Sequence, residues 1–165
     1  MVIIDVYFIL HFLISTVGYA IGSIEGRIGL EYFSEVQAKA QAQQRPNSPK
    51  PTNTKSFAFK CHRDNKDIFC INSIDFHRYN TFCTGGSDGV FSFWDKEARA
   101  RLSSFDAHIR RCPVNVVRFS PMGNALFYAM SYDWSKGAEG NNPSMGVSIV
   151  MHNVLDSEIA PKKKV

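Results

Sequence analysis

Residues 86–95 are the most constraining stretch of the chain, because a tight turn leads directly into a strand. The run Gly-Ser-Asp-Gly at 86–89 supplies two glycines for the turn, and the Asp88 carboxylate can accept hydrogen bonds from its backbone amides. The next residues, Val-Phe-Ser-Phe-Trp at 90–94, suit a pleated and half-buried surface. The stretch therefore predicts a β-hairpin whose second strand ends in Trp-Asp.

A histidine, His62, precedes this hairpin at the separation expected within one repeat. Trp94 follows His62 by about 30 residues, which is the separation expected within a repeat of roughly 40 residues. In WD-repeat blades of β-propellers, a turn Asp, an upstream His and the strand Trp commonly join in one buried hydrogen-bond network. We therefore predict a structural tetrad that includes His62, Asp88 and Trp94, in an all-β, partial WD-repeat β-propeller.

Strand-like segments recur along the chain and divide it into blade-sized units. Because the chain has 165 residues, it is too short for a full propeller and is expected to hold about three blades. The expected units are an apolar segment of uncertain origin at 1–17, a partial blade at 18–62 with a disordered insertion at about 34–55, a complete blade at 63–106, an incomplete last blade at 107–155 and a basic tail at 156–165.

The first 20 residues are largely apolar and leave three interpretations open. They are nearly long enough to span a bilayer, which would make this a membrane-anchored β protein. Asp5 and His11 disfavour a spanning segment, and the absence of Lys or Arg before Arg27 disfavours a signal peptide. A buried strand and non-native sequence are the other two interpretations, and these are preferred.

The sequence offers little support for catalysis. It contains no Gly-x-Ser-x-Gly, P-loop or His-Glu-x-x-His motif, and its four cysteines form no Cys-x-x-Cys pair. His62, Ser87 and Asp88 are the residue types of a catalytic triad. Their positions instead match the structural hydrogen-bond network predicted above, so a hydrolase is not expected. We expect a non-enzymatic protein with reduced cysteines, no cofactor, no metal and no small-molecule substrate. The net charge of +4 is compatible with acidic peptides or nucleic acid.

Four strings in the chain together resemble one family. They are Ile-Gly-Ser-Ile-Glu-Gly-Arg at 21–27, Phe-Ala-Phe-Lys-Cys-His-Arg at 57–63, Gly-Ser-Asp-Gly-Val-Phe-Ser-Phe-Trp-Asp-Lys at 86–96 and Ser-Tyr-Asp-Trp-Ser-Lys-Gly at 131–137. They are similar to the closing, carboxy-terminal blades of the Rae/Gle family of mRNA export factors. The resemblance implies about three blades of a seven-bladed ring. Bub-type spindle checkpoint adaptors at kinetochores share the first two strings and are the alternative.

The resemblance implies a non-enzymatic adaptor in nuclear mRNA export. Its implied partner is a GLEBS-containing FG-nucleoporin, whose GLEBS motif is a short acidic-hydrophobic peptide. Arg27 matches the arginine that pairs with a glutamate of that peptide, and a guanidinium can hold a carboxylate through two parallel hydrogen bonds. Lys60 and Arg63 would add positive charge on the same face. The implied location is the nucleus, at the nuclear envelope and pore, with the cytoplasm as an alternative.

A second candidate site is a basic and aromatic rim. Lys96, Arg99 and Arg101 follow Trp94 at short spacing, and on a strand Arg99 and Arg101 would point to the same side. With Phe59, such a rim would hold single-stranded RNA through phosphate contacts and base stacking, in line with the family's association with RNA. A solvated edge strand with protective charge explains the same pattern equally well.

The string at 131–137 contains a further candidate. Trp134 lies beside Lys136 in an expected loop, and tryptophan is enriched among the residues that dominate protein interfaces. The alternative is that Trp134 folds back over its own blade.

Overall fold

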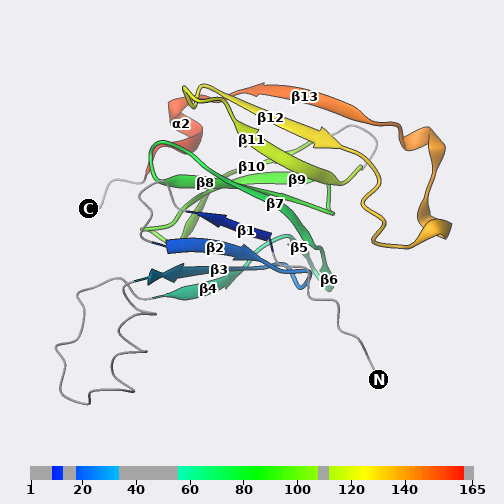
Figure 1. Cartoon of the computed structure of the whole chain (residues 1–165), viewed down its shortest axis with the longest axis horizontal. Helices are drawn as coiled ribbons and strands as arrows, with labels where there is room; N and C mark the ends of the chain where they lie inside the picture. The colour runs from blue at the N-terminus through cyan, green and yellow to red at the C-terminus, as the bar shows by residue number, and fades with distance from the viewer. Residues whose placement is uncertain (1–8, 13–17, 34–55, 108–111, 162–165) are drawn as a thin grey trace, which may run out of the picture.

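The computed structural model describes residues 9–12, 18–33, 56–107 and 112–161 (Figure 1). Their strands form two four-stranded sheets, one three-stranded sheet and one two-stranded hairpin. Every pairing between them is antiparallel. This architecture confirms the predicted all-β class. The expected insertion at about 34–55 lies outside the described residues.

The first sheet takes up part of the apolar amino-terminal segment. Its order is β1-β2-β3-β4, with β1 at Ile9–Phe12, β2 at Gly18–Gly22, β3 at Arg27–Tyr32 and β4 at Phe57–Lys60. In β1, Leu10 lies opposite Ile21 of β2, so this part of the segment is a paired strand. No helix among the described residues is both long enough and apolar enough to cross a membrane.

The second and third sheets come from the continuous chain that follows. The second has the order β10-β9-β8-β7, with β7 at Ile71–Phe76, β8 at Thr81–Gly86, β9 at Val90–Asp95 and β10 at Ala100–Asp106. The third comprises β11 at Val114–Phe119, β12 at Ala125–Met130 and β13 at Ser148–Asn153. A short hairpin that the sequence pattern did not predict, β5 at Arg63–Asp64 and β6 at Asp67–Ile68, precedes β7.

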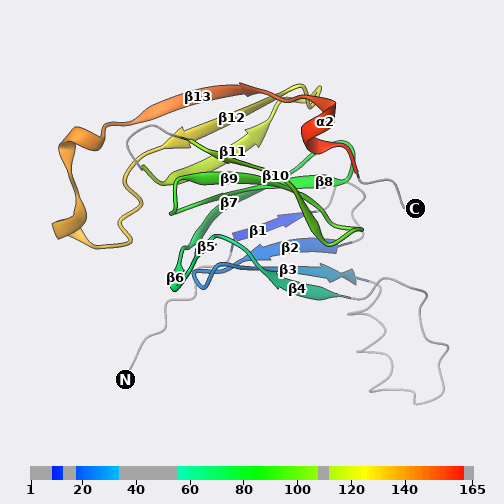
Figure 2. The ribbon, with the colours of Figure 1, turned by 180° about the vertical axis from the view of Figure 1, so that it is seen from behind.

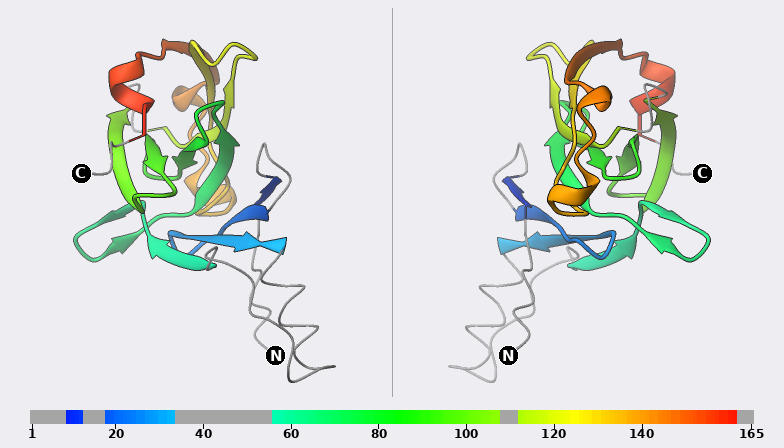
Figure 3. Two further views of the ribbon diagram at one scale, coloured as in Figure 1. Left: turned by 90° about the vertical axis from the view of Figure 1, so that its left-hand side faces the viewer. Right: turned by 90° about the vertical axis from the view of Figure 1, so that its right-hand side faces the viewer.

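The three larger sheets follow one another as successive layers (Figures 1 and 2). The first strand of each sheet packs against the first strand of the next, β1 against β7 and β7 against β11. Seen from either end, the planes of the sheets fan out instead of lying parallel (Figure 3). This is the arrangement expected of neighbouring blades in part of a propeller.

Hydrophobic cores form between the sheets. Ile28, Leu30 and Phe82 belong to the core between the first and second sheets, and Phe93 and Leu126 belong to the core between the second and third. All five side chains are fully buried. Because each core takes side chains from two sheets, each sheet depends on its neighbour for the burial of its apolar surface.

The chain after β13 continues into a short helix. Within the expected basic tail at 156–165, the structure describes 156–161, which begin with α2 at Asp156–Ile159. Ile159 is completely buried in the second core. Tyr79 donates a hydrogen bond to Asp156 Oδ1 at 2.9 Å, and Ser103 donates one to the Glu158 carbonyl at 2.9 Å. The isoleucine therefore anchors α2 to the second core, and the lysines of the expected basic tail lie outside the described residues.

A buried histidine links the second and third sheets. His77 donates from Nε2 to the Gly123 carbonyl at 2.9 Å, and its Nδ1 accepts from the Tyr79 amide at 3.3 Å. Gly123 has φ +73°, and a Cβ there would lie 2.3 Å from His77 Nε2. Burial lowers the pKa of His77. Because both nitrogens are used by the neutral ring, His77 is a structural residue of the β7–β8 turn that holds the β11–β12 turn in place.

Candidate functional site

The expected structural network is assembled around a residue that the sequence pattern did not single out. Trp94 donates from Nε1 to Thr84 Oγ1 at 2.9 Å, and Thr84 Oγ1 lies 2.7 Å from His62 Nε2. On the other side of the ring, His62 Nδ1 lies 2.9 Å from the Asp88 carboxylate. A Cβ on Gly86 would lie 2.4 Å from His62 Nδ1, so the ring needs a glycine beneath it.

This network leaves the supposed triad without a nucleophile. His62 Nε2 bonds to Thr84, while the Ser87 hydroxyl donates to Asp133 Oδ2 instead. A general base must reach the hydroxyl that it activates, and here the imidazole and Ser87 bond to different partners. The arrangement therefore supports a structural role for His62 and Asp88.

Three cations meet at the turn between β2 and β3. Arg27 and Lys60 are direct cross-strand neighbours in the β3–β4 pair, and both are exposed. Arg63 donates from its guanidinium to the Glu25 carbonyl at 2.7 Å. We call Arg27, Lys60 and Arg63 the basic cluster. The three residues expected to bind a peptide are thus brought together around one turn.

The Arg27 guanidinium is the member of the basic cluster with a carboxylate already beside it. Its Nε lies 3.8 Å from Glu25 Oε2, and the two side chains are 47% and 73% exposed. An ion pair this exposed contributes about 0–1 kcal/mol to stability. A carboxylate from a ligand could therefore replace Glu25 at small cost, especially if binding excludes water from the pair.

The expected basic and aromatic rim differs from its prediction at Arg99. Arg99 lies in the turn before β10, with φ +52°, and so it does not share a strand face with Arg101. The left-handed turn instead places its guanidinium carbon 4.2 Å from the centre of the Phe57 ring. That is the geometry of a cation–π contact. Phe57 is therefore a member of this site that the sequence analysis missed.

Two other rim residues are less accessible than expected. Lys96 is only 5% exposed, lies 5.7 Å from the centre of the Tyr32 ring and donates to Glu97 at 3.2 Å. Phe59 is half-buried, with its ring 5.0 Å from that of Trp94. Arg101 is exposed on β10. Lys96 was expected to line an open rim, but its aliphatic stem packs into the protein, as long charged side chains often do.

The two candidate sites occupy opposite ends of the same strands. Arg27 begins β3 and pairs with Lys60, whereas Tyr32 ends β3 and Phe57 begins β4. Six residues of extended strand span about 17 Å. The basic cluster and the pair of Arg99 with Phe57 are therefore separate surfaces.

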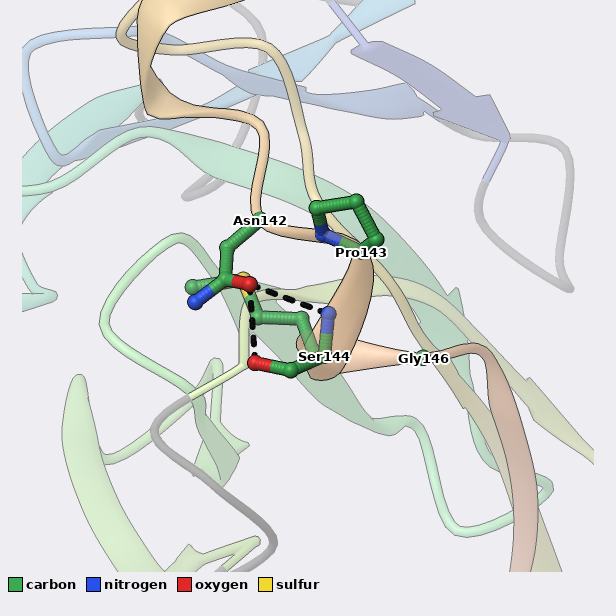
Figure 4. Close-up of a pocket in the computed structure, with 5 residues that line it drawn as sticks. Asn142, Pro143, Ser144 and Gly146 are labelled. Atoms are coloured by element: carbon green, nitrogen blue, oxygen red, sulfur yellow. Dashed lines mark hydrogen bonds between the residues drawn. The ribbon is translucent and has the colours of Figure 1, made fainter.

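The loop before β13 forms a shallow pocket with no charged side chain in its lining. It has a volume of about 620 Å³ and is lined by five consecutive residues of the loop before β13: Asn142, Pro143, Ser144, Met145 and Gly146 (Figure 4). The Asn142 side chain accepts from the Ser144 amide at 3.0 Å and from its hydroxyl at 2.8 Å. No group of three or more His, Cys, Asp or Glu residues in the described parts of the chain could hold a metal ion.

The four thiols are unpaired, and each is at least partly buried. Burial raises the pKa of Cys61 to about 12, and the nearby Asp88 carboxylate adds to the effect. Burial also raises the pKa of Cys83 and Cys112, and that of the half-buried Cys70. Because the thiolate is the reactive form, these thiols are poor nucleophiles in the folded protein.

This predicts an order of alkylation. At about pH 8, iodoacetamide should modify Cys70 first, because its side chain is the most accessible, and should leave Cys61 and Cys83 unmodified until the protein unfolds. Peptide mass spectrometry at several times of reaction would give the order, and full labelling in denaturant is the control. Faster modification of Cys83 than of Cys70 would contradict the burial described here.

Comparison with known proteins gives consistent relatives. Protein RAE1 of Arabidopsis thaliana is 40% identical over 152 residues, which cover 90% of this chain and 38% of that protein. The Poly(A)+ RNA export protein of Schizosaccharomyces pombe is 39% identical over 152 residues, covering 89% of this chain and 38% of that protein. The mRNA export factor GLE2 of Chaetomium thermophilum is 38% identical over 154 residues, covering 90% and 38%. No family model matches the chain. The chain thus spans well under half the length of these relatives.

Proposed function

The chain belongs to the Rae1 and Gle2 family of mRNA export factors, over 38% of its relatives' length, and on that premise we propose that it is part of a non-enzymatic WD-repeat adaptor in nuclear mRNA export. Its proposed partner is a GLEBS-type peptide of an FG-nucleoporin. Its proposed location is the nucleus, at the nuclear envelope and pore, with the cytoplasm as an alternative. The export names of the relatives favour this role over a Bub-type checkpoint role.

The observation that supports peptide binding is the basic cluster. Arg27 and Lys60 are exposed neighbours across two strands, and Arg63 is fixed to the same turn by its bond to Glu25. The exchange of Glu25 for a peptide carboxylate would give Arg27 a two-pronged, charge-assisted contact. Lys60 would then add attraction from the adjacent strand and accelerate the encounter with an acidic peptide.

A pull-down tests this proposal. The chain would be joined to the part of a relative that it lacks, so that a complete propeller is tested, and passed over an immobilised GLEBS-type peptide. The control is a scrambled peptide with the same composition and charge, which attracts the cluster without matching it. Retention by the GLEBS-type peptide alone is expected. Equal retention by both peptides would reduce the cluster to a non-specific cation surface.

We propose single-stranded RNA as a further partner, because the pair of Arg99 with Phe57 favours it. The contact combines a charge for phosphate with an aromatic ring, and the exposed Arg101 lies two residues further along the chain. Arginine and aromatic side chains together bind single strands by neutralising phosphates and stacking on bases. Phe59 and Lys96 would support this surface from the protein interior. Phe59 packs against Trp94, and Lys96 packs against Tyr32.

Replacement of both Arg99 and Arg101 by Glu is expected to weaken RNA binding and flatten its salt dependence. For a single strand, the loss of two phosphate contacts should reduce the slope of log K against log salt by about 1.4. Fluorescence anisotropy with a labelled oligonucleotide at several salt concentrations measures the slope. The matched control replaces Arg27 and Lys60 by Glu, with the same change in charge at the other end. An unchanged slope in the first variant would move the RNA contacts elsewhere.

A further inference from the structure

An exposed tryptophan sits on a strained backbone in the loop between β12 and β13. Trp134 is 61% exposed, which is unusual for so large an apolar side chain. Its φ is +61°, a left-handed conformation that costs a bulky residue free energy. The surrounding structure must therefore hold the residue in place, and strain of this kind is concentrated at binding sites.

The hydroxyl of Tyr132 and the carboxylate of Asp133 hold this loop. The Tyr132 hydroxyl donates to the Gly137 carbonyl at 2.7 Å and accepts from the Lys136 amide at 3.1 Å. The Asp133 carboxylate accepts from Ser87 and from the Ser135 amide, the latter at 3.1 Å. Burial works to raise the pKa of Asp133, but these hydrogen bonds outweigh it and lower the pKa. These bonds hold the loop in one conformation, and the Tyr132 ring lies 5.6 Å from the Trp134 ring.

The loop projects from the same end of the molecule as the β2–β3 turn (Figures 1 and 2), where Arg27 begins β3 and Arg63 bonds to Glu25. Backbone hydrogen bonds connect the turns in between. Ile71 donates to the Ser23 carbonyl at 3.3 Å, beside Glu25, and Ser87 donates to the Cys70 carbonyl at 2.9 Å. The side chain of Ser87 then reaches Asp133. A ligand lying across these turns could therefore contact the basic cluster and Trp134 together.

We propose that Trp134, backed by Tyr132, is a second anchor for the acidic-hydrophobic peptide whose carboxylate Arg27 holds. The inference rests on the peptide binding proposed above. The chemistry of the two anchors matches such a peptide, because the basic cluster attracts its acidic residues and the exposed indole can bury an apolar one. Lys136 is exposed beside Trp134, while the Asp133 carboxylate is turned to donors within the protein. Glu139, in the same loop, is an exposed negative charge that would repel an acidic peptide.

Calorimetry on the complete propeller tests this second anchor. With a GLEBS-type peptide, Trp134→Ala should weaken binding by about 30-fold, the loss typical of an interface hot spot, whereas Trp134→Phe should stay within about threefold of the wild type. Met122→Ala is the matched control, because Met122 is also an exposed apolar residue but lies in the β11–β12 turn, and it should not alter binding. Thermal melting of each variant confirms that it folds.

A second peptide, with its apolar residues replaced by Ser, identifies the contact. It should bind the wild type and Trp134→Ala equally, since the side chain that meets the indole has been removed. A Trp134→Ala variant that binds the first peptide as well as the wild type does, while Arg27→Ala weakens it, would overturn this inference alone. The failure of the wild type to bind either peptide would overturn the proposed function together with it.

Discussion

The isolated 165-residue chain is expected to aggregate or to be degraded. The third sheet leaves apolar side chains on the face that points away from the second. Val116, Ala129 and Ile149 lie in register across its three strands, as do Arg118, Phe127 and Met151, and alternate residues of a strand share a face. Ile149 is 77% exposed, and Phe127 and Met151 are also exposed. An apolar face of this kind promotes association unless another layer covers it.

The open strand edges add to this tendency. Among the described residues, β13 pairs only with β12, so one side of its backbone offers unpaired amide and carbonyl groups. Such an edge is a template for pairing with another chain. In repeat architectures, each unit depends on its neighbours to bury its faces, and the relatives of this chain extend well beyond the 38% that it covers.

Co-expression with the part of a relative that this chain lacks should rescue its solubility. Size-exclusion chromatography with light scattering would compare the chain alone and the complex, and thermal melting would follow the cooperativity of each. The control is Ile149→Lys with Met151→Lys, which should reduce aggregation of the chain alone. A monodisperse monomer with a sharp melt from the unmodified chain would contradict the account, because it would show that these sheets close their own core.

Arg27→Ala in the complete propeller is expected to weaken binding of a GLEBS-type peptide by about 2–5 kcal/mol. This is the loss seen when one partner of a buried, hydrogen-bonded charge pair is removed, since the other charge is then left unpaired. The expected pair forms when the peptide carboxylate displaces Glu25, which lies 3.8 Å from Arg27 Nε. Calorimetry of the two proteins with one peptide measures the difference.

Two controls separate this contact from general charge attraction. Arg101→Ala removes the same charge from β10, at the other end of the sheets, and should change affinity little. Glu25→Gln removes the internal competitor and should leave affinity unchanged or increase it. A loss of less than about 0.5 kcal/mol for Arg27→Ala would mean that Arg27 is only a surface charge.

Local patterns in the sequence account for most of the fold. The strands at 81–86, 90–95 and 114–119 were predictable because each alternates or is bounded by a turn that glycine or proline marks. The β5–β6 hairpin was not, because its strands are two residues long and exposed, so no hydrophobic period marks them. The helix α2 was not predictable from the sequence, because a single buried isoleucine, Ile159, fixes it to a core formed by distant residues.

The candidate sites were predictable where residues act through strand register and not where they act across the fold. Arg27 and Lys60 meet because β3 and β4 pair. Thr84 was missed because its partners, His62 and Trp94, lie 22 and 10 residues away. Phe57 was missed because its contact with Arg99 depends on a left-handed turn conformation, which nothing in the residue type arginine indicates.

A crystal structure of the complete propeller with a bound GLEBS-type peptide tests the central claim most directly. The account predicts a peptide carboxylate within about 3.2 Å of the Arg27 guanidinium, with Glu25 displaced from it. It would be contradicted by a peptide bound elsewhere on the propeller, with Arg27 still beside Glu25 and open to solvent.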